Sequence, residues 1–208
     1  MSDKKQIIIG YSGHGFVVAD AAIEAGMALG FYAEKQESAV NPFRLQYLGF
    51  EGSADFEGWK GDYEFILGIG DNRLRRTVAE SVLINQKALS NVIHPSASIS
   101  ATARYGKGNF IAANVSVNAL AVINDYCILN TGCIVEHECR IGTSVHLAPG
   151  SVLAGNVEIG ENTFIGANAV IKQGIKIGRN AVIGAGAVVL NDIEDNAVYA
   201  GNPAKKIR

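Results

Sequence analysis

Residues 159–189 read IGENTFIGANAVIKQGIKIGRNAVIGAGAVV and place an isoleucine or a valine at every sixth position. The same six-residue series runs from Ile93 to Val189, and its fourteen members from Ile111 onward are all aliphatic. An α-helix repeats every 3.6 residues and a strand every two, so neither produces this period. A period of six is typical of a triangular solenoid, in which each hexapeptide supplies one short strand and one corner.

A second inward position falls four residues after each aliphatic one and holds mostly small side chains. Cys127, Cys133 and Cys139 all occupy it, so we expect them to pack inside the prism, facing its interior from three different sides. A zinc site needs closely paired ligands, and a nucleophilic thiolate needs an exposed, electropositive setting. The spacing of the cysteines therefore predicts no metal site. The hexapeptides of residues 93–194 should form nearly six coils, which would make a prism about 27 Å tall at the strand spacing of a parallel sheet.

The first ninety residues instead alternate short apolar runs with segments that are apolar at helical spacing. This alternation predicts a small parallel α/β unit. We therefore expect a mixed fold with two domains: a Rossmann-like α/β domain over residues 1–90 and a β-helix with a C-terminal tail over residues 91–208. The expected strands are 6–10, 31–33 and 63–69, and the expected helices are 16–29 and 72–87.

The formal net charge is −2, and the chain contains no basic run. This balance gives no electrostatic reason to expect nucleic acid or an anionic membrane as a partner. No uninterrupted apolar run is long enough to span a bilayer, and the first residues, MSDKKQIIIGYSGHG, do not resemble a secretory signal. With three cysteines and no such signal, we expect reduced thiols in a cytoplasmic protein.

His137 is the candidate catalytic residue, because it is the third residue of the hexapeptide that begins at Val135 and so falls at or near a corner, outside the prism. Glu136 and Glu138 flank it. Histidine suits proton removal near neutral pH, and a carboxylate bonded to the imidazole fixes its tautomer. From the residues alone, a solvated surface turn explains this segment about as well as a catalytic site does.

The N-terminal glycines read Gly10-Tyr-Ser-Gly-His-Gly15, between an expected strand and an expected helix. Glycines in this place let backbone N–H groups approach phosphate oxygens at a helix N-terminus. The order is G-x-x-G-x-G, so the dinucleotide fingerprint G-x-G-x-x-G is not met. Glu34 lies about where a ribose-binding acid falls in such domains. A tight strand–helix turn without a ligand is the alternative.

Several motifs together resemble one family over essentially the whole chain. The repeats IGENTF, IGANAV, IGRNAV and IGAGAV, with the ending VYAGNPAKKIR, resemble the hexapeptide-repeat acyltransferases, whose fold is the left-handed β-helix. The combination of GYSGHG with ILNTGCIVEHECRIG resembles the sialic acid O-acetyltransferase and bacillosamine-type N-acetyltransferase family within that superfamily. This resemblance implies an acetyltransferase that acylates the 4-amino group of a nucleotide-linked, UDP-type amino sugar with acetyl-CoA. O-acetylation of sialic acid is the nearest alternative.

The resemblance also implies roles for individual residues. His137 would be the general base and Glu138 the residue that raises its basicity, while His146 would contact the acetyl end of coenzyme A. Backbone contacts to coenzyme A fall on Ala167 and Ala185. Substrate contacts fall on Ser12, Gly13, His14, Glu34, Lys35, Asn72 and Asn130, although Lys35 departs from the acidic pair expected there.

The family forms homotrimers, so the resemblance implies an active site in the cleft between neighbouring subunits. Two other classes remain open from the sequence. A zinc carbonic anhydrase on the same fold needs three converging histidines, whereas only His137 and His146 lie in the repeat proper. A non-catalytic scaffold would need neither the His-Glu pair nor the glycine-rich turn.

Overall fold

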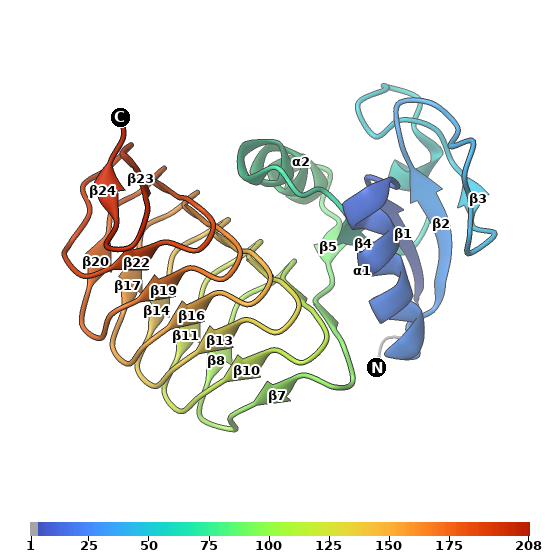
Figure 1. Ribbon diagram of the computed structural model, residues 1–208. Helices are drawn as coiled ribbons and strands as arrows, with labels where there is room; N and C mark the ends of the chain where they lie inside the picture. The colour runs from blue at the N-terminus through green and yellow to red at the C-terminus, as the bar shows by residue number, and fades with distance from the viewer. Residues whose placement is uncertain (1–3) are drawn as a thin grey trace.

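The computed structural model describes residues 4–208 and consists of an α/β domain beside a three-sided β-helix (Figure 1). The α/β domain has a five-stranded parallel sheet in the order β3-β2-β1-β4-β5. Strand order reverses between β1 and β4, and such a switch point leaves a crevice at the carboxyl ends of the strands. The elements are β1 (Lys5–Ile9), α1 (Gly13–Glu24), β2 (Leu29–Ala33), β3 (Gln46–Tyr47), the 3-10 helix η1 (Glu57–Trp59), β4 (Tyr63–Leu67), α2 (Asn72–Ile84) and β5 (Ala88–Leu89).

Helix α1 differs from the expected segment 16–29 at both ends. It begins at Gly13, because the glycine-rich turn itself forms the first helical turn, and Phe16 N–H donates to the carbonyl of Ser12. It ends at Glu24, because Gly26 adopts a φ of 72° just beyond the C-cap, where a left-handed residue terminates a helix. The short edge strands β3 and β5 carried no recognisable apolar pattern and were not expected.

The second domain winds three parallel sheets around a shared interior. We call them the first, second and third faces in the order in which each coil visits them. The first face holds β6 (Val92–Ile93), β9 (Phe110–Ile111), β12 (Ile128–Leu129), β15 (His146–Leu147), β18 (Phe164–Ile165), β21 (Val182–Ile183), β23 (Val198–Ala200) and the antiparallel β24 (Lys205–Lys206).

The other two faces repeat the same two-residue strands. The second face holds β7 (Ser98–Ile99), β10 (Ser116–Val117), β13 (Ile134–Val135), β16 (Val152–Leu153), β19 (Val170–Ile171) and β22 (Val188–Val189). The third face holds β8 (Arg104–Tyr105), β11 (Val122–Ile123), β14 (Arg140–Ile141), β17 (Glu158–Ile159) and β20 (Lys176–Ile177).

The register of the β-helix follows the hexapeptide series. Each strand pairs with one eighteen residues later, as Leu129 pairs with Leu147, so equivalent aliphatic side chains stack in the interior. From Ile111 to Val189 every member of the series is buried, and the three cysteines are fully buried beside them. Tyr105, the exception in the series, is 43% exposed. The expected fold, an α/β domain followed by a β-helix, is confirmed.

Corners of the β-helix have a second six-residue series that the sequence analysis did not use. From Gly108 to Gly186, every sixth residue adopts a positive φ, which favours glycine and asparagine. Most members are Gly or Asn, and the exceptions are Leu120, Tyr126, Glu138 and Ser144. Three of these exceptions belong to the sites described below.

The two domains share one hydrophobic core. Residues of the sheet and of α1, such as Ile8 and Val18, belong to the same buried cluster as Phe110 and Ile111 of the β-helix. Helix α1 packs on β6, and the gap between the ribbons in Figure 1 is bridged by side chains of α2. Neither helix of the described residues is long and apolar enough to cross a membrane.

Candidate active site

The glycine-rich turn is packed tightly against the end of β4. Gly10 has a φ of 87°, and a Cβ on either Gly15 or Gly68 would collide with the carbonyl oxygen of Gly10. These three glycines therefore bring the N-terminus of α1 directly beside the loop after β4. The predicted strand–helix turn is present, and two of its glycines, Gly10 and Gly15, are needed for this close approach.

A cleft of about 560 Å³ opens at the carboxyl ends of β1, β2 and β4. Its lining includes Ser12, His14, Glu34 and Lys35, four of the residues predicted to bind substrate. Ser12 is the N-cap of α1, but its side chain makes no capping hydrogen bond, so the first N–H groups of α1 are open. The space beside Gly13 is also empty, since a Cβ added there would meet no atom within 4 Å. The N-terminus of α2 is closed by Asp71, whose carboxylate accepts from Leu74 N–H. An anion in this cleft would therefore meet the N-terminus of α1.

Glu34 holds the glycine-rich turn in place. Its two carboxylate oxygens accept from the backbone N–H groups of Tyr11, at 3.1 Å, and Lys35, at 3.0 Å. Glu51 lines the same cleft, and burial, followed by the nearby Glu34 charge, raises the pKa of its carboxyl. The cleft thus combines the carboxylates of Glu34 and Glu51, which can accept hydrogen bonds, with the open N–H donors at the N-terminus of α1.

Asn72 bridges the two domains. Its Nδ2 donates to the carbonyls of Asn162, at 3.0 Å, and Thr163, at 3.2 Å, while its Oδ1 accepts from Arg75. The backbone carbonyl of Asn72 accepts from the hydroxyl of Ser144, one of the four corner exceptions. Both side-chain amide protons of Asn72 are therefore used in the interface between the domains, although Asn72 also lines a groove described below.

Arg75 is the largest fully buried side chain and was not identified from the sequence. Its guanidinium donates to the carbonyls of Tyr126, Ile69, Gly70 and Ser144 and to Oδ1 of Asn72. Burial lowers its pKa to about 10, so the group is charged at neutral pH. Its hydrogen-bond partners are all neutral oxygens, which makes it a buried cation held by carbonyl dipoles.

His14 and His146 meet where the domains join, with ring centroids 6.0 Å apart. Burial, followed by the positive charge of Arg75, lowers the pKa of each to about 4. Asn130 Oδ1 accepts from Thr131 N–H, which turns Asn130 Nδ2 toward Nε2 of His146 at 3.3 Å. Because an amide nitrogen only donates, this network assigns Nε2 of His146 as an acceptor in a neutral ring.

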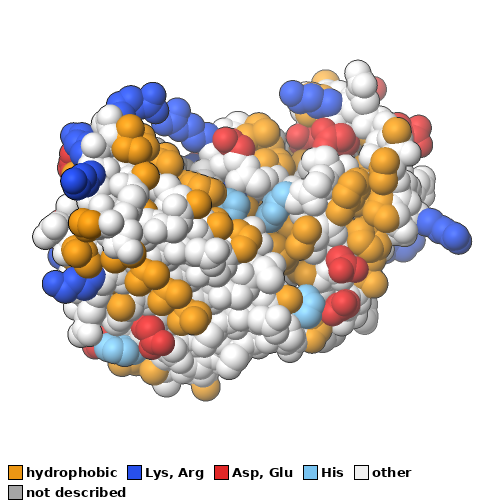
Figure 2. All heavy atoms as spheres, in the orientation of Figure 1, with side chains coloured by type: hydrophobic (Ala, Val, Ile, Leu, Met, Phe, Trp, Pro, Cys, Tyr) orange, Lys and Arg blue, Asp and Glu red, His pale blue; other side chains and the backbone are white. Residues whose placement is uncertain are grey.

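A groove of about 460 Å³ lies between the start of α2 and the first face. Gly70, Asp71, Asn72 and Arg73 form one wall, and Asn162, Phe164, Asn180 and Val182 form the other. Figure 2 shows histidine side chains at the surface where the two domains meet. Ala167 and Ala185, the predicted cofactor contacts, stack in successive coils where the first face turns into the second, with Gly186 N–H donating to Ala167.

His137 lies at a corner between the second and third faces, outside the prism as predicted. Its Nδ1 is 3.2 Å from Oε2 of Glu138, and both side chains are about half exposed. A carboxylate only accepts, so this contact places the ring proton on Nδ1 and leaves Nε2 free to accept one. Glu138 has a φ of 61° and is the third of the corner exceptions that belong to these sites.

Within one chain, the predicted residues therefore form separate groups. The cleft group (Ser12, Gly13, His14, Glu34 and Lys35) and the interface group (Asn72, Asn130 and His146) adjoin through His14. His137 and Glu138 stand at the corner opposite the first face, away from both groups.

The cysteines are buried as predicted, and burial raises the pKa of Cys127 and Cys133 to about 12. Residues 4–208 contain no cluster of three or more His, Cys, Asp or Glu that could hold a metal ion.

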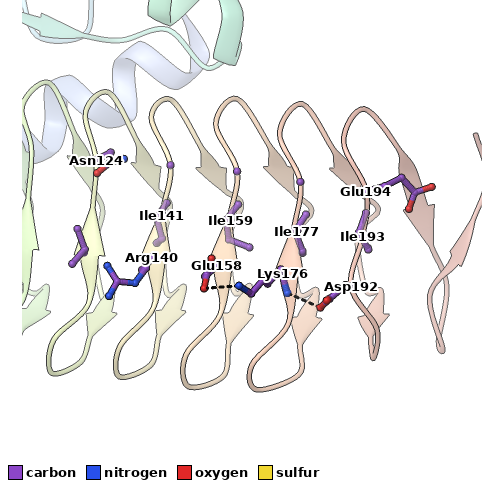
Figure 3. A pocket seen from close by; sticks show the side chains of 14 residues that line it. Asn124, Arg140, Ile141, Glu158, Ile159, Lys176, Ile177, Asp192, Ile193 and Glu194 are labelled. Atoms are coloured by element: carbon purple, nitrogen blue, oxygen red, sulfur yellow. Dashed lines mark hydrogen bonds and ion pairs between the residues drawn. The ribbon is translucent and has the colours of Figure 1, made fainter.

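The third face carries a separate, shallow groove of about 700 Å³. Figure 3 shows Arg140, Glu158, Lys176 and Asp192 projecting from successive coils, with glycines above them. Lys176 is 3.2 Å from Glu158, and its backbone N–H donates to Asp192. The groove is lined by two cations, Arg140 and Lys176, and three carboxylates, Glu158, Asp192 and Glu194, so it has no cationic excess that would attract an anion.

Comparisons with known proteins agree with this architecture. Residues 5–82 match the family described as the PglD N-terminal domain, and residues 156–191 match the hexapeptide repeat of succinyl-transferase. A GDP-perosamine N-acetyltransferase of Escherichia coli O157:H7 is 33% identical over 93 residues, which cover 45% of this chain and 42% of that protein. The aligned part of the chain thus spans less than half of that curated relative.

Solved structures that match essentially the whole chain include those of two relatives. The acetyltransferase domain of PglB from Neisseria gonorrhoeae FA1090, in complex with acetyl coenzyme A, is 32% identical, covers 99% of this chain and 100% of that one, and gives a TM-score of 0.93. PerB from Caulobacter crescentus, in complex with CoA and GDP-perosamine, is 35% identical over 100% of this chain and 99% of that one, with a TM-score of 0.92. The chain therefore belongs to the PglB/PerB family of nucleotide-sugar N-acetyltransferases, within the hexapeptide-repeat acyltransferase superfamily.

Proposed function

We propose that this chain transfers the acetyl group of acetyl-CoA to the 4-amino group of a nucleotide-linked amino-dideoxy sugar. The observation that carries the proposal is the presence, in one chain, of an open helix N-terminus in a nucleotide-sized cleft and an exposed imidazole oriented by a carboxylate on a hexapeptide β-helix. Family membership supports the same reaction class, since PglB was solved with acetyl coenzyme A and PerB with CoA and GDP-perosamine.

His137 is the proposed general base. The amine nitrogen attacks the thioester carbonyl carbon, an N–C bond forms, the C–S bond breaks, and coenzyme A leaves as the thiol after taking up a proton. Nε2 of His137 accepts the proton that the amine loses, and Glu138 stabilises the resulting imidazolium through Nδ1. The three cysteines take no part, because buried thiols with raised pKa values are poor nucleophiles.

The α/β domain is the proposed nucleotide site. The diphosphate would lie at the N-terminus of α1, contacting Ser12, Gly13 and His14, and Glu34 and Lys35 would face the ribose or base. The sequence resemblance favours UDP, whereas the sugar bound to PerB is GDP-perosamine. The sugar would extend toward Asn72 and Asn130, and coenzyme A would lie against Ala167 and Ala185 with its acetyl end near His146. Because Nε2 of His146 is an acceptor, backbone N–H groups are the better candidates for stabilising the oxyanion.

A trimer would complete the site. His137 is on the opposite side of the prism from the groove lined by Asn72, so a neighbouring subunit must supply one of the two groups. Co-expression of a His137→Ala chain with a chain carrying a bulky residue at Gly13 should restore activity in mixed trimers. Sedimentation of a fully active monomer would contradict this arrangement.

The substrate proposal is tested by mixing the protein with acetyl-CoA and UDP-, GDP- or dTDP-linked 4-amino sugars and following thiol release. We expect one nucleotide amino sugar to be acetylated and CMP-sialic acid to be inert. Thiol release with sialic acid alone would contradict the choice of an amine acceptor.

The base is tested by His137→Ala. Loss of the imidazole should lower kcat by about 100-fold or more, since general bases contribute about 10²–10⁴-fold. The melting temperature should stay near that of the unaltered protein, because the His137 side chain is half exposed. A kcat/KM for the amino sugar within about threefold of the original would exclude His137 as the base.

A further inference from the structure

Gly155 lies directly against the imidazole of His137, one coil further along the same corner. A Cβ on Gly155 would come within 3.0 Å of both Cε1 and Nε2 of His137, and 3.1 Å from Nδ1. Real Cβ atoms essentially never approach other heavy atoms closer than 3.0 Å. The next residue, Asn156, pairs with the same corner through the backbone, since its N–H donates to the carbonyl of His137 at 2.8 Å. The ring edge that carries the free Nε2 thus occupies the space that a side chain at residue 155 would fill.

The backbone does not require a glycine at residue 155. Gly155 is absent from the glycines with positive φ, in contrast to Gly132, Gly150 and Gly174 at neighbouring corners. Every other residue in the same place of the repeat, from Ala101 to Ala185 in steps of six, carries a side chain, whether alanine, proline or a longer polar residue. Gly155 is also the buried member of that series, because the imidazole covers it.

We infer that Gly155 is a positioning residue, whose missing side chain lets the His137 imidazole lie across the corner with Nε2 at a fixed place. Glu138 fixes the ring from its Nδ1 edge, and the flat Gly155 backbone supports the opposite edge. A methyl group at residue 155 would leave the fold intact but turn the ring away. This inference rests on the proposed role of His137 as the base.

The test is Gly155→Ala, alone and in a His137→Ala background. In the unaltered background we expect kcat to fall roughly 10- to 100-fold, the range over which a 1 Å misplacement acts, and the kcat/KM pH profile to change shape. The melting temperature should be unchanged or higher, because alanine at an unstrained φ restricts the unfolded chain. In the His137→Ala background the same methyl group should have no further effect on kcat, because no ring remains to be displaced.

Gln173→Ala is the matched control, since Gln173 occupies the same place one coil beyond Gly155 and is exposed. It should leave kcat within about twofold of the original. If the loss caused by Gly155→Ala persists undiminished without His137, the methyl group acts on something other than the imidazole and the inference is wrong. If Gly155→Ala has no effect while His137→Ala is impaired, only this inference fails. If His137→Ala is itself fully active, the proposed base fails first.

Discussion

At the scale of single residues, Arg75 is the clearest case of a side chain that the sequence did not reveal. In ILGIGDNRLRR it is one of three arginines on a surface-like helix, and nothing in its spacing separates it from Arg73 or Arg76. The structure buries it to 1% exposure with five neutral oxygens as acceptors. It becomes distinguishable only when α2 is packed on the β-helix, because two of its acceptors are the backbone carbonyls of Tyr126 and Ser144.

Replacing Arg75 with Met should therefore be costly. The apolar side chain fills the space but leaves several buried carbonyls without donors, and the free energy of unfolding should fall by at least about 3 kcal/mol. The pKa values of His14 and His146 should rise, because the Arg75 charge is one cause of their depression. Denaturant unfolding and NMR titration of the two histidines measure these effects.

Arg76→Met is the matched control for that change. Arg76 also bridges α2 to the β-helix, through Glu161 at 2.7 Å, but the pair is partly exposed. Its loss should cost less than about 1 kcal/mol, as is usual for surface ion pairs, and leave both histidines unaffected. Equal losses from the two variants would show that burial of Arg75 is not what stabilises the interface.

At the scale of elements, three of the four departures from the corner rule of the β-helix fall at the domain interface or beside His137. The corner series takes glycine or asparagine at most positions, since positive φ strains other residues. Tyr126 and Ser144 depart from it where α2 docks, and Glu138 departs beside His137. The strain at Glu138 is tolerated because only a carboxylate at that corner reaches the imidazole.

Glu138→Asn should separate stability from activity. Asparagine adopts positive φ more readily, so the free energy of unfolding should rise by about 1 kcal/mol, while kcat falls because the imidazole loses its carboxylate. Leu120→Asn, at the same corner one coil earlier with a φ of 63°, should stabilise equally and reports the backbone effect alone. Thermal unfolding with kinetics on both variants checks this. If Glu138→Asn were destabilising while Leu120→Asn was not, the Glu138–His137 contact would outweigh the strain.

The sequence was sufficient for features that depend on local periodicity. The aliphatic series predicted the prism, the inward cysteines and the outward corner of His137, because every coil obeys the same rule. It was insufficient where one element meets another that is distant in sequence. The interface role of Asn72 is one example, since its two amide protons reach carbonyls about ninety residues away in sequence. Gly155 could not be distinguished from other glycines in the sequence, because its proposed role depends on its contact with His137 in the preceding coil.

At the scale of the whole molecule, one continuous buried core joins the two domains and extends from the sheet into the β-helix. Arg75 and Asn72 tie the start of α2 to three corners, at Tyr126, Ser144 and Asn162. The proposed nucleotide site in one domain is thereby held rigidly against the proposed coenzyme A site on the other. Unfolding of residues in α2 should therefore accompany unfolding of the first coils.

This interface makes stability depend on pH. His14 and His146 have pKa values lowered from 6.5 to about 4, because burial and then the Arg75 charge disfavour protonation. Between these values the unfolded chain binds more protons than the folded one, so stability is fully present above pH 6.5 and is lost as the pH falls toward 4. A shift of this size corresponds to at most about 3 kcal/mol per histidine. Urea unfolding between pH 7 and pH 4 should show the decline, and His14→Gln with His146→Gln should flatten it. A decline that begins only below pH 4, or one that the double variant leaves unchanged, would assign the acid sensitivity to carboxylates instead of to the two buried histidines.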